Sequence, residues 1–509
     1  MKFKVVIAIA GFLLLASEEI SAQVYSFPEY ANLFSRVQAG GSARIRAMGG
    51  VQNSLGGDVS SAYYNPAGLG MFNRSDFSLT LGYSITSASA NYINTNTNDS
   101  GSKLIVPNFG IAFNSKKDGS KLLSGTFAIN FNRINDFNNS FTYTGRNDST
   151  SIIDYFMQQA DGRDSTQFQS GTNTRPEGVN YNTLTGLAFN NYLIGPLNEL
   201  DFNAPKDLYY SRVPLQSIVQ KETVKTTGAQ NQWSFSYGVN LSDRIFIGGG
   251  LGLSTINYKT TATYSENYSL NPLQSMSLTE SLELSATGIN ATLGIIGRPI
   301  DQVQLGFSLA TPTSYAISET YTAVMSSKWN NYQYFPGFFL NNVKENLDIL
   351  TNDYTLITPW RFSGGATFFI QKKGLISADV EYLSYGSSKY SNLGTSDLEN
   401  QDIKTLYQSV LNIRVGGEYR LNNYRFRGGF NLMPDPYKTA QNDVDRTLTS
   451  YTAGIGYRRP SFYVDMAFVL QQGNTTHTPY TTQSPIPASY NVTLKNQTTS
   501  VMFTVGFPF

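Results

Sequence analysis

From Ser75 to the C-terminus, the chain is made of short stretches in which apolar and polar side chains alternate. Between Phe77 and Ile85 every odd-numbered residue is apolar, and serine, threonine or glycine fills the even positions. A period of two is that of a β-strand, so each stretch has one apolar and one polar face. We count 14 such stretches, which predicts an all-β chain of 14 antiparallel strands.

The connections between these stretches alternate in length. Six are short turns, such as 241–244 and 421–423, and seven are longer polar loops. Bacterial outer-membrane barrels have short turns at one end and long loops at the other, whereas β-sandwiches and propellers do not sort their loops in this way. The sequence therefore predicts a 14-stranded antiparallel transmembrane β-barrel over 75–509, with its long extracellular loops at one end.

The longest connection, 134–230, is expected to carry short helices. Ser151 and Asp154 have the Ser-x-x-Asp spacing of a helix start, and a second apolar stretch covers 184–200. Loops of this length are usually functional or disordered. Two interpretations stay open, namely a lid or capture surface for apolar molecules, or a loop that packs only on itself.

The first 22 residues predict a cleaved signal peptide. Lys2 and Lys4 precede an apolar run from Val5 to Ala16, and Ile20-Ser21-Ala22 follows it. The run of about 12 residues is too short for a membrane-spanning helix, which needs about 20. Export together with a predicted barrel indicates the outer membrane of a Gram-negative bacterium, with outer-membrane lipid as a partner.

The last strand, 497–509, alternates to the end of the chain. Val501, Phe503, Val505, Phe507 and Phe509 share one face. A terminal strand that ends in phenylalanine is similar to the signal read by the outer-membrane assembly machinery. That machinery is therefore an expected partner through Phe509.

The composition argues against several other classes of function. The chain has no cysteine and a single histidine, His477, which leaves no thiol chemistry and no clustered-histidine metal site. A net charge of +1 gives no general attraction to nucleic acid. No expected helix begins with a lysine-containing phosphate-binding loop or with a dinucleotide-binding glycine motif. We expect no enzyme activity, no catalytic residues, no cofactor and no metal.

Strand parity places charged side chains inside the predicted barrel. In 374–388, Ile376 and Val380 face outward, so Asp379 and Glu381 face inward. The opposite assignment would put charges in lipid at a cost of about 2–4 kcal/mol each near the midplane. Such charges form a network that bridges strands and holds a plug, or one arginine binds the carboxylate of a ligand. The expected lumenal set is Arg361, Asp379, Glu381, Arg414, Glu418, Arg425 and Arg427.

A cluster of aromatic residues lies in the predicted outer loop 326–354. Six large aromatic side chains within eleven residues are hard to bury in one loop, which favours a surface that captures apolar molecules. These candidate capture residues are Trp329, Tyr332, Tyr334, Phe335, Phe338 and Phe339.

The segment 42–72 is rich in glycine and small residues, as expected of a chain threaded through a crowded space. Its core, Tyr64-Asn65-Pro66-Ala67-Gly68-Leu69, resembles the N-terminal plug of the FadL/TodX outer-membrane transporters of hydrophobic compounds. Further stretches resemble strands of the same barrels in the same order, including TPWRFSGGATF at 358–368 and IRVGGEYRL at 413–421. The ordered set, rather than any single piece, carries the resemblance.

The resemblance implies a barrel blocked by an N-terminal hatch at 23–74, with gating at Asn65, Pro66, Ala67, Gly68 and Leu69. It implies passive uptake in which outer loops capture the ligand, an internal apolar site holds it, and a kink in the third strand releases it sideways. Gly125 is the candidate kink; alternatively it packs beneath an aromatic ring of a neighbouring strand.

Long-chain fatty acids are the ligands that this resemblance favours, with aromatic hydrocarbons as a second class. The alternative is a barrel of the same type that serves as a scaffold or shuttle for protein secretion or surface attachment. An internal cavity that leads to a gap in the wall would favour transport, whereas a filled lumen would suit a scaffold.

Overall fold

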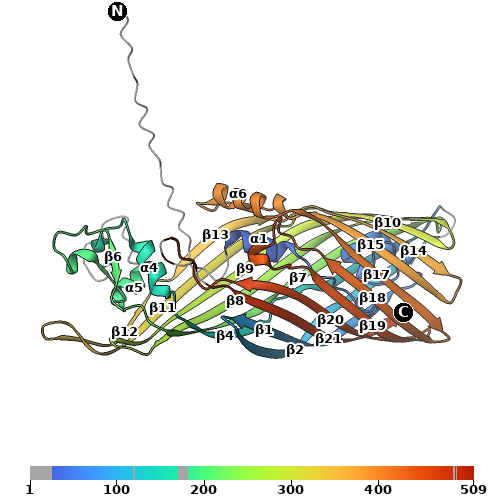
Figure 1. The fold of residues 1–509 in the computed structure, drawn as a ribbon. Coiled ribbons are helices and arrows are strands. Elements are labelled where there is room, and N and C mark those ends of the chain that lie inside the picture. Colours follow the sequence, from blue (N-terminus) through green and yellow to red (C-terminus); the bar gives the residue numbers. More distant parts are fainter. Residues whose placement is uncertain (1–25, 118–120, 170–181, 485, 487, 489) are drawn as a thin grey trace, which may run out of the picture.

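The computed structural model describes residues 26–117, 121–169, 182–484, 486, 488 and 490–509, so the predicted signal peptide lies outside the described residues. The strands form one closed antiparallel barrel, which confirms the predicted fold class (Figure 1). Its wall has 14 strand positions, here called staves. The ring closes where β1 pairs with β21, from Asp76↔Pro508 to Asn91↔Thr493.

Several staves consist of two or three strands separated by short breaks. In chain order the staves are β1 (Asp76–Tyr92), β2 (Thr95–Lys116), β3 (Leu122–Asp136) with β4 (Asn139–Asn147), β7 (Ile218–Leu241), β8 (Ile245–Tyr268), β9 (Leu273–Ile300), β10 (Val303–Ala310) with β11 (Ser314–Phe335), β12 (Phe338–Asn346) with β13 (Leu350–Ile357) and β14 (Arg361–Ile370), β15 (Gly374–Ser384) with β16 (Lys389–Ser391), β17 (Ser409–Leu421), β18 (Tyr424–Met433), β19 (Leu448–Arg458), β20 (Tyr463–His477) and β21 (Val492–Pro508).

The alternation in the sequence corresponds to an outer and an inner face of the wall. Leu81, Phe307 and Phe503 are about half exposed on the outside, whereas inner neighbours such as Thr80, Ser308 and Thr504 are buried. An exposed apolar belt around a closed barrel is the surface that lipid covers. Among the described residues, no helix is both long and apolar enough to cross a bilayer.

The staves on one side of the barrel are much longer than a membrane requires. β9 has 28 residues and β8 has 24, whereas about 9–11 tilted residues span the hydrocarbon. The surplus extends toward the end that carries the long connections, here called the long-loop end (Figure 1). The prediction of an outer loop at 326–354 is therefore wrong, because β11 and β12 continue as a hairpin to a turn at Pro336 and Gly337.

The long connection between β4 and β7 carries small helices, as predicted. They are α4 (Ile152–Ala160), η2 (Ser165–Phe168), α5 (Leu184–Asn190) and η4 (Leu197–Glu199), beside a small sheet of β5 (Ile194–Pro196) and β6 (Tyr209–Ser211). The Ser151–Asp154 capping box forms, since Ile153 N–H donates to Ser151 Oγ and Ser151 N–H donates to Asp154. Elsewhere, η5 (Tyr385–Ser387), α6 (Ser396–Leu406) and η6 (Gln441–Asp443) lie between later strands.

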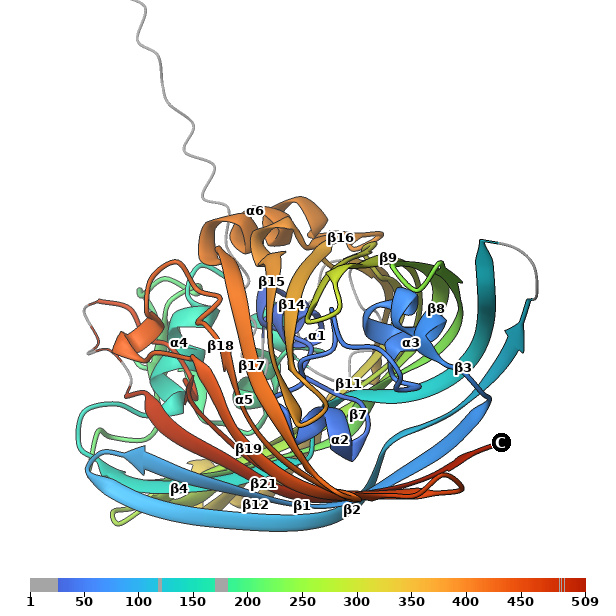
Figure 2. The ribbon, with the colours of Figure 1, turned by 90° about the vertical axis from the view of Figure 1, so that its right-hand side faces the viewer.

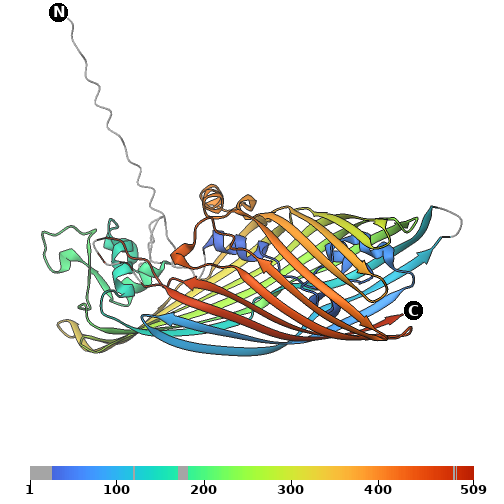
Figure 3. The same cartoon turned by 45° about the vertical axis from the view of Figure 1, so that its right-hand side comes forward.

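Residues 26–72, here called the lumenal segment, lie inside the ring of strands (Figures 2 and 3). They form α1 (Phe27–Ser35), α2 (Ala43–Arg46), α3 (Ser61–Tyr64) and η1 (Pro66–Met71). The wall approaches this backbone through glycines: a Cβ on Gly416 or Gly429 would collide with the main chain of Met48. Glycine is required at such positions because any side chain would fill the space that the segment occupies.

Candidate functional site

One flank of the lumenal segment is tightly docked on β7, β8 and β9. Asn65 is fully buried; its Nδ2 donates to Asn53 O at 2.6 Å, and its Oδ1 accepts from Ala67 N–H at 3.1 Å. The wall opposite is again glycine, since a Cβ on Gly248 would meet Pro66 and one on Gly294 would meet Asn65. The residues that the sequence predicts as the gate, 65–69, are therefore an anchor in this structure.

The predicted lumenal charges contact the lumenal segment and one another. Asp379 Oδ2 accepts from the N–H groups of Gln52 and Asn53 at 2.7 and 2.8 Å, which fixes the segment to β15. Glu381 pairs with Arg414 at 2.8 Å across neighbouring strands. These contacts match the network interpretation of the charges.

A second group of charges lies nearer the short turns. Glu418 accepts from Arg427 Nε at 2.8 Å and from Arg420 Nε at 2.7 Å, and Arg427 also pairs with Asp465 at 2.5 Å. Arg425, although predicted to join this set, donates instead to the turn carbonyls of Asn422 and Tyr424. It lies at the first residues of β18, where the turn supplies closer acceptors than the lumen does.

Arg361 contacts the lumenal segment rather than an acid. Its Nη1 donates to Tyr63 Oη at 2.9 Å, and the guanidinium lies 5.5 Å from the centre of the Tyr63 ring. It lines a cavity of only about 10 Å³ beside Phe34 and Tyr315. That is about the space of one water molecule.

Next to β7, between β2 on one edge and β3 and β4 on the other, the wall has a break in its hydrogen-bonded ladder, here called the seam. β2 pairs with β3 only from Asn108↔Asn132 to Lys116↔Ser124. Beyond Asn108, β2 pairs with β1 from Ile105 to Thr95, while β4 pairs with β7. Across the residues that the structure describes, no ladder pair joins 95–107 to β3 or β4.

Pro107 explains where the seam begins. Proline has no N–H to donate to a neighbouring strand and is confined to edges and bulges of sheets. The β1–β2 register also shifts at this level, between Thr80 and Gly82. The Val106-Pro107 pair inside a predicted strand was the sequence signal for the seam, and our sequence interpretation did not use it.

Side chains close the outer part of the seam. Lys103 Nζ donates to Asn138 Oδ1 at 3.1 Å, and Thr142 N–H donates to Asp99 Oδ2 at 2.5 Å. Between these bridges and the Asn108↔Asn132 pair, the two edges share no ladder pair in the described chain. The seam is thus held by a few polar side chains rather than by main-chain hydrogen bonds.

The lumenal segment runs directly behind the seam. Gln38 N–H donates to Ile134 O at 3.1 Å, and Gly41 N–H donates to Asn132 Oδ1 at 2.9 Å. Gly40 N–H donates to Tyr64 Oη, and burial raises the pKa of Tyr64 to about 12. Residues 38–41 therefore contact the β3 edge through the N–H groups of Gln38 and Gly41 and through Gly40, which leaves no space for a Cβ beside the Asn132 side chain.

A cavity of about 60 Å³ lies between residues 38–46 and the wall at this level. It reaches the seam, because Ile105 and Pro107 of one edge and Ile134 of the other line it. Its remaining wall comes from the inner faces of β20, β21 and β1. Arg46, which the sequence interpretation passed over, lines this cavity together with Arg133 and Asp136 of β3, which pair with each other at 3.3 Å.

The third strand does not leave the ladder at Gly125. That residue pairs with Ser115 on one side and with Val239 on the other. A Cβ there would collide with the Tyr237 side chain. Gly125 therefore matches the alternative interpretation, in which it packs beneath an aromatic residue of a neighbouring strand. The irregularities in the β3–β7 register lie between Leu122 and Ser124 and between Arg133 and Asn135.

Above the lumenal segment, toward the long-loop end, apolar side chains fill the barrel. Tyr30 and Phe34 of α1 pack with Phe156 of α4 and with wall residues such as Tyr258 and Tyr315 in one large cluster. This cluster occupies the place where the sequence predicts an apolar ligand site. The site is closed by packed side chains in this structure.

The predicted capture residues divide into two groups on the β11–β12 hairpin. Trp329 is 2% exposed, while Tyr332 and Tyr334 pack on the apolar cluster. Phe335, Phe338 and Phe339 remain 37–53% exposed, and the rings of Phe335 and Phe338 stack at 4.9 Å. Only the tip of the hairpin presents aromatic surface to the outside.

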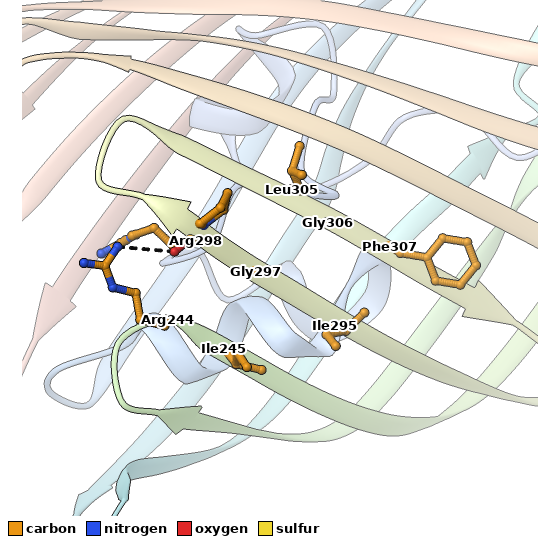
Figure 4. Close-up of a pocket in the computed structure, with 9 residues that line it drawn as sticks. Arg244, Ile245, Ile295, Gly297, Arg298, Leu305, Gly306 and Phe307 are labelled. Carbon is orange, nitrogen blue, oxygen red and sulfur yellow. Dashed lines mark hydrogen bonds between the residues drawn. The ribbon is translucent and has the colours of Figure 1, made fainter.

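The outer wall has a separate apolar groove of about 600 Å³ near the short turns. Figure 4 shows its main lining, in which Ile245, Ile295, Leu305 and Phe307 surround Gly297. These side chains are exposed on the outer face, so the groove opens toward the membrane. Their inward neighbour Ile296 packs on Ala67 of the lumenal segment.

The histidine of the chain has an acidic partner. His477 Nε2 lies 2.7 Å from Glu222 Oε2, a carboxylate partner that the sequence did not suggest. Within the described ranges, no group of three histidine, cysteine, aspartate or glutamate side chains is arranged to hold a metal ion.

Comparison with known proteins places the fold. No protein-family model and no curated protein sequence matches the chain. A FadL homologue from Pseudomonas aeruginosa superposes with a TM-score of 0.56 at 11% identity, covering 93% of this chain and 99% of that one. This chain has the FadL-type fold. The toluene transporter TodX from P. putida superposes with a TM-score of 0.51 at 12% identity, covering 92% and 99%.

Proposed function

We propose that the protein is a passive outer-membrane transporter of hydrophobic compounds, with long-chain fatty acids as its principal ligands. The FadL-type fold and the apolar belt support the outer-membrane location, with the long-loop end outside the cell and Phe509 presented to the assembly machinery. Aromatic hydrocarbons are the second ligand class, because the neighbour TodX is described as a toluene transporter.

The seam is the observation that carries this proposal. A closed barrel normally pairs every strand with both neighbours, since unsatisfied main-chain groups are expensive in lipid. Here thirteen residues of β2, 95–107, lack that pairing on one side, and a cavity beside the lumenal segment ends at the gap. A break of this kind gives an apolar molecule a sideways route from the lumen to the membrane.

On this proposal, the path is closed in the conformation described above. A cavity of about 60 Å³ holds roughly four water molecules, at about 15 Å³ each, and not a long acyl chain. Transport therefore requires residues 38–46 to move away from the seam. We infer that residues 65–69 stay fixed on β7–β9 during this movement, because their contacts are the tighter ones.

The test is binding and uptake of a fatty acid by the whole chain. Purified protein is titrated with oleate, and oleate uptake is measured in cells that lack their own fatty-acid transporter. Saturable binding together with uptake above that of empty cells supports transport. Absence of saturable binding for oleate and toluene alike would refute it.

One observation favours a second function. The long-loop half of the barrel is packed with apolar side chains, and the α4–β6 region carries Leu200 and Phe202, which are 65% and 93% exposed. A filled barrel with an apolar outer surface also suits a scaffold or shuttle for secreted or surface-attached proteins. Capture of a protein through this region, without ligand binding, would favour that alternative.

A further inference from the structure

The lumenal segment carries three arginines, Arg36, Arg44 and Arg46, and two of them have partners. Arg36 Nη2 donates to the main-chain carbonyls of Met433, Pro434 and Arg446 at 2.8–3.2 Å. Arg44 Nη1 donates to Gly57 O at 3.2 Å, and its Nε lies 3.8 Å from Glu418. Both guanidinium groups are thus compensated by protein acceptors.

Arg46 differs from both. The Nε atoms of all three arginines are buried without a hydrogen-bond partner. Among the described residues, however, the terminal nitrogens of Arg46 also make no hydrogen bond or ion pair, whereas those of Arg36 and Arg44 do. Burial lowers the pKa of Arg46, and only the nearby Tyr64 acts in the opposite direction; no carboxylate does. Removing a charge from water without a partner is unfavourable, so buried charges in proteins are normally paired.

The surroundings of Arg46 suit a small anionic group with an apolar tail. The cavity that it lines has the hydroxyls of Ser84 and Ser500, which hydrogen-bond to each other, on one wall and Ile105 and Pro107 at the seam. The other charged groups of its lining, Arg133 and Asp136, are paired with each other. Its volume of about 60 Å³ fits a carboxylate. A longer chain attached to that group would have to extend along the apolar edge of the seam.

We propose that Arg46 binds the carboxylate of the transported amphiphile at the inner mouth of the seam. This inference rests on the proposed transport of hydrophobic compounds and specifies their class as carboxylates. A guanidinium group binds a carboxylate through two parallel hydrogen bonds. Because Arg46 is in α2, this pairing would couple ligand arrival to the part of the lumenal segment that lies behind the seam.

The experiment compares two ligands that share a chain and differ in charge. Oleate and oleyl alcohol are titrated into the detergent-purified full chain of wild type, Arg46→Gln, Arg46→Lys and the control Arg459→Gln. Arg459 is an exposed residue at a short turn, away from the cavity. Migration on unheated gels, where folded barrels resist SDS, verifies folding of each variant.

We expect Arg46→Gln to weaken oleate binding roughly 10- to 100-fold, since a charged hydrogen bond is lost. Oleyl alcohol binding stays unchanged, Arg46→Lys restores part of the oleate affinity, and Arg459→Gln resembles wild type. As a second route, Ser500→Leu narrows the cavity and produces the same selective loss if Arg46→Gln does not fold.

The opposite results separate the two claims. Unchanged oleate affinity in Arg46→Gln, or an equal loss for both ligands, would overturn the role of Arg46 and leave transport standing. Failure of the wild-type protein to bind either ligand would overturn the proposed function itself.

Discussion

The two flanks of the lumenal segment meet the barrel wall in different ways. At Asn65 and Pro66 the segment is pressed against glycines of β7–β9, in a wall whose ladder is continuous. At 38–46 it faces the seam and a cavity, and it carries the unpaired guanidinium of Arg46. The first flank has no space for movement without breaking contacts. The second lies beside a cavity, although it too is held to the wall, for example by Ala43 N–H donating to Thr504 Oγ1 at 2.8 Å.

This contrast indicates how one short segment can both close and open a barrel. Close packing against bare main chain makes the anchored flank stiff, because interiors at such density resist small displacements. Because a cavity and a break in the ladder adjoin the seam flank, we propose that the segment opens there. The difference predicts which substitutions damage the fold and which change only transport.

The largest effect is expected at the anchored flank. Gly294→Val on the inner face of β9 would place a side chain where Asn65 lies, and overpacking of this kind costs about 1–3 kcal/mol or more. We expect loss of the SDS-resistant folded form on unheated gels.

Gly297→Val is the matched control, since a Cβ at Gly297 of the same strand meets open space. This variant should fold as wild type does. Equal behaviour of the two variants would contradict the tight docking of the anchored flank.

A smaller loss is expected from Asp379→Ala. It removes a carboxylate that accepts two main-chain N–H groups of the lumenal segment. Hydrogen bonds to charged groups contribute about 1.5–3 kcal/mol to stability. The free energy of unfolding, measured in guanidinium chloride, should therefore fall by about that amount. The control is Asp353→Ala, which removes an exposed carboxylate of β13 and should leave the unfolding transition unchanged. A shift of the same size in this control would indicate a general charge effect instead.

The seam should respond to Pro107→Val with a change in transport rather than in stability. Valine supplies the missing N–H, which allows the β2–β3 ladder to extend past Asn108. We expect slower amide exchange at 133–136 and oleate uptake reduced several-fold, with an unchanged unfolding transition. Faster uptake together with unchanged exchange would speak against the seam as the route.

The smallest effect is expected at the exposed hairpin tip. Phe338→Ala removes surface that stacks on Phe335 outside the barrel, and a rim contact of about 1 kcal/mol corresponds to roughly fivefold slower capture. Stopped-flow association of a fluorescent fatty acid measures this rate. Gln333→Ala on the same hairpin serves as control, and the idea fails if both variants associate at the wild-type rate.

Much of the architecture could be predicted because alternation and loop length are local properties. The period of two between Phe77 and Ile85 fixes which side faces lipid, and the same rule correctly turned Asp379 and Glu381 inward. The ends of the staves could not be predicted, because beyond the membrane the strands no longer need one apolar and one polar face, and the alternation is lost. That is why the β11–β12 hairpin was interpreted as a loop.

The site was harder to predict than the barrel because it depends on contacts between distant parts of the chain. The register of the strands decides which glycine of Gly416-Gly417 faces the lumenal segment. Whether Arg46 has a partner depends on all the wall residues around it. Arg425 shows the same limit, since its parity was right but a turn carbonyl lay closer than any acid. Pro107 was the one local signal of the seam.

The central claim is that ligand passes through the seam, and a reversible cross-link tests it most directly. The chain has no cysteine, so Lys103→Cys with Asn138→Cys gives a unique pair across the seam for a short cleavable linker. Lys259→Cys with Glu283→Cys gives the control, because those side chains form an ion pair across the continuous β8–β9 ladder. We predict that linking 103 to 138 stops oleate uptake, that cleavage restores it, and that linking 259 to 283 has no effect. Undiminished uptake with the seam linked would contradict the lateral route.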